Sequence, residues 1–219
     1  MRNAIENNIF LKMVDLSKIY LFRMTHIMNI PHILQFGITH STSPNANPDF
    51  VPIGDGNLIT TRSQFLLDNG SLLGDYVPFY FGYRMPMLYV IQYGYNLVNS
   101  TQAENIVYCV SSVQKIIDLN LDYVFTDGHA VDSFSSQYSH ANINQIDTLL
   151  DFNAIKAKYW SNDVDLDLKR RKEAEFLVEG DININAIIGY VTYNQTTKHK
   201  LETFGIQENF IHIRPGYYF

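Results

Sequence analysis

The chain has 219 residues, 46% of them hydrophobic and 17% charged, and its formal net charge is −6. This length corresponds to one domain with a substantial core, so we expect residues 1–219 to form a single domain. The negative charge argues against bulk attraction to nucleic acid or anionic membrane, although an acidic protein can still carry a local basic patch. Cys109 is the one cysteine, which excludes an intrachain disulfide and a thiolate metal cluster.

Several function classes lack their sequence signals. No apolar run approaches the roughly 18–20 residues that cross a bilayer, and the N-terminus lacks a signal-peptide h-region. We therefore expect a cytoplasmic monomer with no membrane partner. Rossmann and P-loop glycine motifs, H-E-x-x-H and the G-x-S-x-G elbow are all absent, and seven scattered histidines form no ligand set, so we expect no metal.

The first part of the chain alternates short predicted elements with a long loop. Residues 19–24 predict a strand that ends in a polar corner. Asn29-Ile30-Pro31 is typical of a helix start, with Asn29 as the cap, and Gly37 is well placed as the stop. Residues 40–56 hold three prolines and two glycines, and a loop of this length inside a domain is usually functional or disordered.

The next segment is unusually aromatic. A short helix carrying Arg62 is expected first, capped by Thr60 or Thr61. Residues 74–89 then interleave Tyr, Phe and Arg, a composition that could stack nucleobases. The alternative is a core strand followed by a Pro-initiated helix over residues 87–93. Both interpretations stay open.

The second half continues the alternation. An Asp-Gly turn after a strand at 123–126 is expected to present His129 at the sheet edge. The remaining expected elements are strands at 106–112, 189–193 and 210–213, helices at 113–119 and 196–204, a loop at 133–144 and a broken helical pattern at 146–159. Short strands and short helices under long loops favour an α+β fold over a doubly wound one.

Residues 169–178, K-R-R-K-E-A-E-F-L-V, place four cations before a predicted strand. Residues two apart in a strand share a face, so Glu173 and Glu175 are expected to point the same way. A carboxylate beside cations suits chemistry that develops positive charge on a polyanionic substrate. The plainer interpretation is a solvated charge run before an edge strand.

Five ordered motifs resemble a known family. They are R-M-T-H-I-M-N-I-P-H-I-L-Q-F-G-I, G-D-G-N-L-I-T-T-R, D-Y-V-P-F-Y-F-G-Y-R-M-P-M-L-Y, V-F-T-D-G-H-A and R-R-K-E-A-E-F-L-V. From about residue 19 to 219 the chain resembles DarT, the DNA ADP-ribosyltransferase toxin of DarT–DarG toxin–antitoxin systems. The resemblance implies an ADP-ribosyltransferase fold, α+β with a split β core, related to poly-ADP-ribose polymerase catalytic domains.

The resemblance also implies an activity and its partners. NAD is the expected co-substrate, and ADP-ribose is transferred to a base in single-stranded DNA with release of nicotinamide. The motif at 80–87 favours thymidine by resemblance. Guanosine, RNA or a protein stay open as acceptors, as does an inactive nucleotide- or DNA-binding module of the same fold. A macrodomain antitoxin, DarG, is the implied protein partner.

Site residues follow from the motifs by position. Arg62 matches the catalytic arginine and Glu175 the catalytic glutamate. The expected NAD contacts are Arg23 (where the family often has His), Met24, Thr25, His32, His40 and Arg62. The expected DNA contacts are Tyr80, Arg84, Met87 and His129 for the base, and Lys169 and Arg170 for phosphates, with Lys156 and Lys158 extending the phosphate track.

These residue types suit the implied chemistry. Breaking the nicotinamide–ribose bond builds oxocarbenium character at the anomeric carbon, as glycoside cleavage does. The carboxylate of Glu175 can stabilise that charge and orient the incoming base nitrogen. Arg62 can hold the diphosphate or the nicotinamide ribose. Because arginine is nearly always protonated, an electrostatic role is favoured over a base role.

Overall fold

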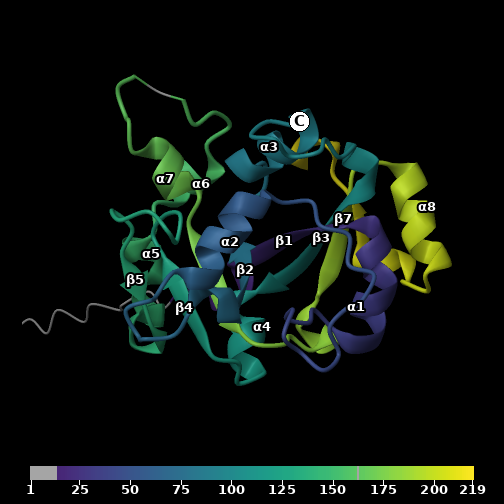
Figure 1. The fold of residues 1–219 in the computed structure, drawn as a ribbon, viewed down its shortest axis with the longest axis horizontal. Coiled ribbons are helices and arrows are strands. Elements are labelled where there is room, and N and C mark those ends of the chain that lie inside the picture. The colour runs from purple at the N-terminus through teal and green to yellow at the C-terminus, as the bar shows by residue number, and fades with distance from the viewer. Residues whose placement is uncertain (1–13, 162) are drawn as a thin grey trace, which may run out of the picture.

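The computed structural model describes residues 14–161 and 163–219, which form one eight-stranded sheet with helices around it (Figure 1). The strand order is β5-β4-β6-β2-β1-β3-β7-β8. The strands are β1 Tyr20–His26, β2 Tyr76–Tyr80, β3 Ile106–Ser112, β4 Tyr123–Thr126, β5 Gln137–Tyr138, β6 Glu175–Glu179, β7 Gly189–Thr192 and β8 Ile211–Ile213. Neighbouring strands are antiparallel except β7 and β8, which are parallel.

Short helices connect the strands. They are α1 Ile30–Phe36, α2 Gly56–Gln64, α3 Pro86–Tyr93, α4 Val113–Asp118, α5 Ile146–Leu149, α6 Phe152–Lys156, α7 Leu168–Lys172 and α8 Gln195–Thr203. Among the described helices, none has the length and apolarity that crossing a bilayer requires. The expected α+β architecture is confirmed.

The sheet is split at its centre. β1 pairs along its whole length with β3. Its pairing with β2 is much shorter and brings Phe22 opposite Tyr80. β2 in turn pairs along its whole length with β6, so Tyr80 also lies opposite Glu175. Arg23 bridges the split, because its Nη1 donates to the carbonyl oxygen of Pro78 at 3.0 Å. The split β core expected from the resemblance is therefore present.

Both faces of the sheet are covered at β3, which explains why this strand lacks polar side chains from residue 106 to residue 110 except for the Tyr108 hydroxyl. Val107 and Cys109 pack into the core shared with α1, α4 and α8, while Tyr108 and Val110 pack against α3 and the C-terminal Tyr218. A strand buried on both faces favours apolar side chains. The buried Ser111 near the end of β3 is satisfied by donating to Ala186 O at 2.7 Å. Burial raises the pKa of Cys109 to about 12, which keeps this thiol protonated and fits a packing role in the core.

Helix α1 begins and ends where expected, but its expected side-chain cap is not formed. Gly37 ends the helix with a φ of +82°, a conformation that favours glycine. Asn29 occupies the predicted N-cap position, but its side chain makes no capping hydrogen bond. Its Nδ2 donates to Thr25 Oγ1 and to Val51 O, and its Oδ1 accepts from Val51 N, so this buried side chain holds the long loop at 40–56 against β1 instead.

Helix α2 is capped by Asp55, not by Thr60 or Thr61 as predicted. The Asp55 carboxylate accepts from the backbone N–H groups of Asn57 and Leu58 at 2.9 and 3.3 Å. Both threonine hydroxyls lie inside the helix and donate to carbonyl oxygens four residues earlier. The helix therefore starts earlier than predicted and carries Arg62 in its last turn.

Residues 169–178 also differ from the prediction. The four cations belong to α7, and β6 starts at Glu175, so Glu173 is the C-terminal cap of α7 rather than a strand residue. The prediction that Glu173 and Glu175 share a strand face was wrong, because aspartates at 165 and 167 pair with the cations and stabilise a helical turn. The predicted loop at 133–144 contains β5 and a 3₁₀ segment, His140–Gln145.

Candidate active site

Arg62 and Glu175, 113 residues apart in sequence, form a two-point ion pair at the split of the sheet. Arg62 Nη1 donates to Glu175 Oε1 at 3.0 Å, and Nη2 lies 2.9 Å from Oε2. The Glu175 side chain is 0% exposed and the Arg62 side chain 13%. The structure thus brings together the two residues predicted to be catalytic.

The environment of Glu175 keeps its carboxylate charged. Burial opposes ionisation, but the positive charge of Arg62, the proximity of His129 and the Ala130 N–H together hold the pKa of Glu175 below its usual value. The same pair raises the pKa of Arg62 against the effect of its own burial. At neutral pH the site therefore presents a fixed anion and a fixed cation.

The loop after β4 positions Glu175. The Ala130 backbone N–H donates to Glu175 Oε1 at 2.9 Å. The Thr126 hydroxyl accepts from the Glu175 backbone N–H at 3.2 Å and donates to Gly128 O at 2.6 Å. Sequence reasoning missed Thr126 and Ala130 as site residues. The T-D-G-H-A turn was the available signal, but a backbone donor such as Ala130 leaves no side-chain pattern.

Tyr80 and His129 complete the surroundings of the ion pair. Burial and the negative charge of Glu175 raise the pKa of Tyr80 well above its usual value, so its hydroxyl stays protonated. Burial, opposed by Glu175 and reinforced by Arg62, lowers the pKa of His129, so its ring is neutral at pH 7. Both predicted base-recognition residues therefore lie close enough to the catalytic pair to feel its charges.

Glu173 is a second carboxylate beside this site. It is 8% exposed, and burial raises its pKa to about 7, against the attraction of Lys169 and with repulsion from Glu175. Within the described part of the chain, its carboxylate makes no salt bridge. At neutral pH, Glu173 is close to half protonated.

The residues predicted to contact NAD lie on β1, α1 and the following loop. Burial and repulsion from Arg62 lower the pKa of Arg23 to about 10. Thr25 is buried and accepts a hydrogen bond from Asn29 Nδ2 at 3.0 Å, while the Met24 side chain is half-buried. His32 packs on Phe36 at 4.8 Å between ring centroids.

His40 joins the loop to the region of α2. Its Nε2 contacts Gly74 O, its Nδ1 lies 2.8 Å from Thr42 Oγ1, and its backbone N–H donates to Asp181. A Cβ built on Gly74 would lie 2.7 Å from the Cα of Ser63, the residue after Arg62. His40 is thereby linked through a close backbone approach to the helix that carries Arg62.

The polar atoms of this site that lack a hydrogen-bond partner are suited to binding NAD. Arg62 Nη2 and Glu175 Oε2 are buried without a well-aligned hydrogen bond, although they lie close enough to attract each other. A ribose hydroxyl or a phosphate oxygen of a bound dinucleotide would supply the missing partners. When bound, the dinucleotide would supply the ADP-ribose and the nicotinamide leaving group. No group of His, Cys, Asp and Glu side chains suited to a metal occurs in residues 14–161 and 163–219.

Arg84 and Met87 lie where β2 passes into α3. Arg84 adopts a φ of +52° and its guanidinium lies 4.3 Å from the ring centroid of Phe219. Met87 is half-buried and packs against the core formed by α3 and β3. The segment at 74–89 therefore forms the core strand and the Pro-initiated helix of the second interpretation, joined by a loop in which Tyr83 is exposed. Base stacking by this segment stays a prediction.

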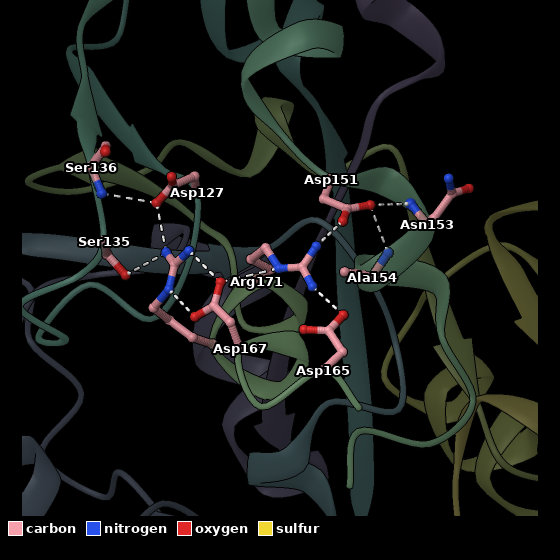
Figure 2. Close-up of polar contacts among 10 residues, drawn as sticks. Asp127, Ser135, Ser136, Asp151, Asn153, Ala154, Asp165, Asp167 and Arg171 are labelled. Carbon is pink, nitrogen blue, oxygen red and sulfur yellow. Dashed lines mark hydrogen bonds and ion pairs between the residues drawn. The ribbon is translucent and has the colours of Figure 1, made fainter. Parts of the chain in front are cut away.

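Three of the four cations at 169–172 are held by internal partners. Arg170 pairs with Asp127 and Asp167 at 2.9 and 2.7 Å. Arg171 contacts Asp151 and Asp165, and Figure 2 shows these carboxylates converging on its guanidinium. Lys172 is 1% exposed. The solvated charge run considered from the sequence was wrong, and Lys169 is left as the cation of this segment without a salt bridge among the described residues.

Comparison with known proteins gives consistent matches. The model of the family described as "ssDNA thymidine ADP-ribosyltransferase, DarT" matches residues 22–219. A DNA ADP-ribosyl transferase of Escherichia coli O127:H6 is 31% identical over 208 residues, covering 92% of this chain and 94% of that protein. A fusion of a DNA ADP-ribosyl transferase with a DNA ADP-ribosyl glycohydrolase, from Thermosipho africanus, is 28% identical over 72% of this chain and 38% of its own length.

The fold comparison agrees. DarT of Thermus sp. 2.9 in complex with ADP-ribosylated single-stranded DNA superposes with a TM-score of 0.79 at 29% identity, covering 92% of this chain and 96% of that one. The same protein in complex with NAD+ gives a TM-score of 0.76, covering 94% and 100%.

The fold and the site define an ADP-ribosyltransferase. The match over nearly the whole chain shows the family within this class: the chain belongs to the DarT family of single-stranded DNA thymidine ADP-ribosyltransferases. It is a DNA-modifying enzyme that uses NAD as co-substrate, of the family that supplies the toxins of DarT–DarG systems.

Proposed function

We propose that Arg62 and Glu175 carry the transfer of ADP-ribose from NAD to a thymidine base in single-stranded DNA. The observation that supports this assignment most directly is the buried two-point pair at the sheet split. There the Arg62 charge keeps the carboxylate ionised against the effect of burial, and hydrogen bonds from Arg62 Nη1 and the Ala130 N–H orient it. The Thermus relatives bound to NAD+ and to ADP-ribosylated DNA support the substrates.

The roles follow from the charges. Glu175 stabilises the positive charge that develops at the anomeric carbon when the bond to nicotinamide breaks and its electron pair leaves with nicotinamide. Glu175 also orients the thymine N–H, whose proton is released as the new carbon–nitrogen bond forms. Arg62 holds Glu175 in place and binds the diphosphate or ribose. Tyr80 and His129, both uncharged at neutral pH, contact the base, and Lys169 contacts a phosphate.

The catalytic assignment is tested with Arg62→Ala and Glu175→Gln. Removing one preorganised electrostatic group typically lowers the rate by about 100- to 1,000-fold, so each variant should lose that much activity. Mass spectrometry of a single-stranded oligonucleotide incubated with NAD measures the product, and circular dichroism checks the fold. Glu179→Gln, an exposed carboxylate at the other end of β6, is the matched control. Turnover by Glu175→Gln at the rate of the unaltered protein would sink the assignment.

The acceptor base is tested on the same product. Nucleoside digestion of the modified oligonucleotide should release ADP-ribosylated thymidine, and an oligonucleotide without thymidine should stay unmodified. Release of an ADP-ribosylated guanosine would contradict thymidine as the acceptor and identify guanosine instead.

We also propose a cytoplasmic monomer that is opposed by a macrodomain antitoxin with DNA ADP-ribosyl glycohydrolase activity. The Thermosipho africanus fusion of the two activities supports this partner. Co-expression of such a glycohydrolase should restore growth to cells that express this chain. Continued toxicity beside an active glycohydrolase would contradict the pairing, and light scattering measures the oligomeric state.

A further inference from the structure

A cavity of about 570 Å³ lies at the end of the sheet split, beyond the Phe22–Tyr80 pair. The start of β1, the loop between β2 and α3, the end of α6 and the C-terminal residues border it. Neither Arg62 nor Glu175 lines it. The cavity is therefore distinct from the position of this pair.

One wall of this cavity is aromatic. Tyr83 and Tyr217 stack with ring centroids 3.5 Å apart and planes 2° from parallel, and Phe22 meets both rings edge-on at 6.0 Å. Tyr83 is 40% exposed, so the stack holds its ring in place while leaving part of it open. A fixed, partly open aromatic face binds any nucleobase by stacking.

The lining also carries cations. It includes Lys18, Arg84, Lys156 and Lys158 and one carboxylate, Asp147, and Lys18 pairs with Asp15 at 2.8 Å. Within residues 14–161 and 163–219, Lys156 and Lys158 form no salt bridge, and both are exposed. This local excess of positive charge stands against a net charge of −6 for the chain. Lysines beside stacking aromatics are the combination that holds a single strand by its phosphates and bases.

The cavity is connected to the catalytic strand in two ways. Tyr83 follows Tyr80 by three residues, a reach of at most about 10 Å along the chain, and Tyr80 lies opposite Glu175. Lys172, three residues before Glu175, donates from Nζ to Ile155 O at 3.0 Å and to Ala157 O at 2.7 Å. This buried lysine holds the segment that carries Lys156 and Lys158 against the element that precedes the catalytic strand.

We propose that this cavity is a subsite for a nucleotide flanking the modified base, with its base on Tyr83 and its phosphates near Lys156 and Lys158. The proposal rests on the proposed function, because it extends the same single strand away from the thymidine at Glu175. Loss of a stacked base weakens binding by about 10- to 100-fold. The affinity and KM should therefore depend on one particular flanking position.

The test uses fluorescein-labelled oligonucleotides with one thymidine, trimmed by one nucleotide at a time from each end. Anisotropy gives the Kd and mass spectrometry gives the KM of modification. For the unaltered protein, trimming past one position should raise both by about 10- to 100-fold. In Tyr83→Ala and in the double variant Lys156→Ala/Lys158→Ala, trimming should matter little: the Kd and the KM of the trimmed oligonucleotide, each divided by the value for the full oligonucleotide, should fall toward one. Tyr83→Phe should restore both ratios, since the ring is kept.

Tyr93→Ala and Lys200→Ala, exposed residues away from the cavity, are the matched controls. Modification without any dependence on Tyr83 or on flank length would overturn the subsite and leave the proposed function standing. Binding that depends on Tyr83 without modification of any oligonucleotide would support the subsite and overturn the proposed function. Absence of both binding and modification would overturn both.

Discussion

At the scale of single residues, the buried pair of Arg62 and Glu175, which we propose as catalytic, also affects stability. Two opposite charges removed from water stabilise each other, whereas either one alone is a buried unpaired charge. Glu175 is 0% exposed, and its remaining partner is the Ala130 N–H. The site thus depends on both residues being present.

This coupling is measurable in a double-mutant cycle. Arg62→Ala should lower the free energy of unfolding by about 3 kcal/mol, because it leaves Glu175 buried and unpaired. Adding Glu175→Gln to Arg62→Ala should recover part of this loss, since the neutral amide needs no counter-charge. Urea unfolding of the single variants and the double variant gives the interaction energy. Strictly additive effects would contradict the coupling.

Glu173 predicts a pH dependence of opposite sign to that of an ordinary salt-bridged carboxylate. Its pKa is 4.5 as a free side chain and about 7 in the folded protein, because burial disfavours the charge. The folded state therefore holds a proton that the unfolded state has lost, and stability falls as the pH rises from about 4.5 through 7. Above that range the cost is on the order of 3 kcal/mol.

Glu173→Gln should remove this cost. The variant is expected to be more stable than the unaltered protein at pH 8 and close to it at pH 5, measured by urea unfolding at both values. Glu179→Gln, on the exposed end of β6, is the control for a simple change of net charge. A larger stabilisation at pH 5 than at pH 8 would contradict the proposed burial cost.

At the scale of elements, the short helix α2 positions Arg62 with little core of its own. None of its residues is buried, and Asp55 caps its first turn. Its contacts with the segment Leu73–Asp75 and the ion pair with β6 hold it in place. A helix with so little burial depends on its cap and its ion pair for a defined position.

Loss of that cap should affect activity as well as stability. Asp55→Ala removes two hydrogen bonds to backbone N–H groups and is expected to cost about 1 kcal/mol of stability. Because Arg62 lies in the same helix, the rate of modification should fall, while Asp55→Asn or Asp55→Ser, which also cap helices, should retain it. Thermal melting and product yield are the two readouts. Full activity of Asp55→Ala would show that the ion pair alone positions the helix.

A second feature at this scale is the cluster of ion pairs around Arg170 and Arg171. It joins α7, the start of α6 and the loop after β4 through carboxylates at 127, 151, 165 and 167 (Figure 2). These contacts place α7 directly before Glu175. The prediction that Arg170 binds a DNA phosphate stays a prediction, and such a contact would have to compete with two carboxylates.

At the scale of the whole molecule, the distribution of charge predicts a modest salt dependence of DNA binding. Among the described residues on the proposed DNA side, the cations without a salt bridge are Lys156, Lys158 and Lys169, and Lys18 pairs with the exposed Asp15. About four phosphate contacts give a slope near −3 for log affinity against log salt on a single strand. If Arg170, Arg171 and Lys172 also contacted phosphates, the slope would approach about −5.

Anisotropy titrations of a single-stranded oligonucleotide at several salt concentrations measure this slope. Lys169→Ala should reduce it by less than one, and Arg170→Gln should leave it unchanged while lowering the melting temperature. A slope near zero would contradict the lysine-lined track altogether.

Local patterns in the sequence determined most of the elements, and the family resemblance indicated the pair that we propose as catalytic. Apolar β3, the Pro-initiated α3 and the glycine at 37 are each specified by residues close together in the chain, so their prediction needed no tertiary information. The ordered motifs were sufficient to indicate the family, with Arg62 and Glu175 inside them.

Tertiary structure decided which polar groups meet. The side-chain contacts of Asn29 and the position of Glu173 were misassigned, and the roles of Thr126 and Ala130 were missed, because their partners or burial depend on residues far away in the chain. The cations at 170–172 likewise appear free in sequence, yet carboxylates and carbonyls from other elements hold them. Hydrogen bonds and ion pairs act over a few ångströms in space, whereas sequence patterns report only neighbours along the chain.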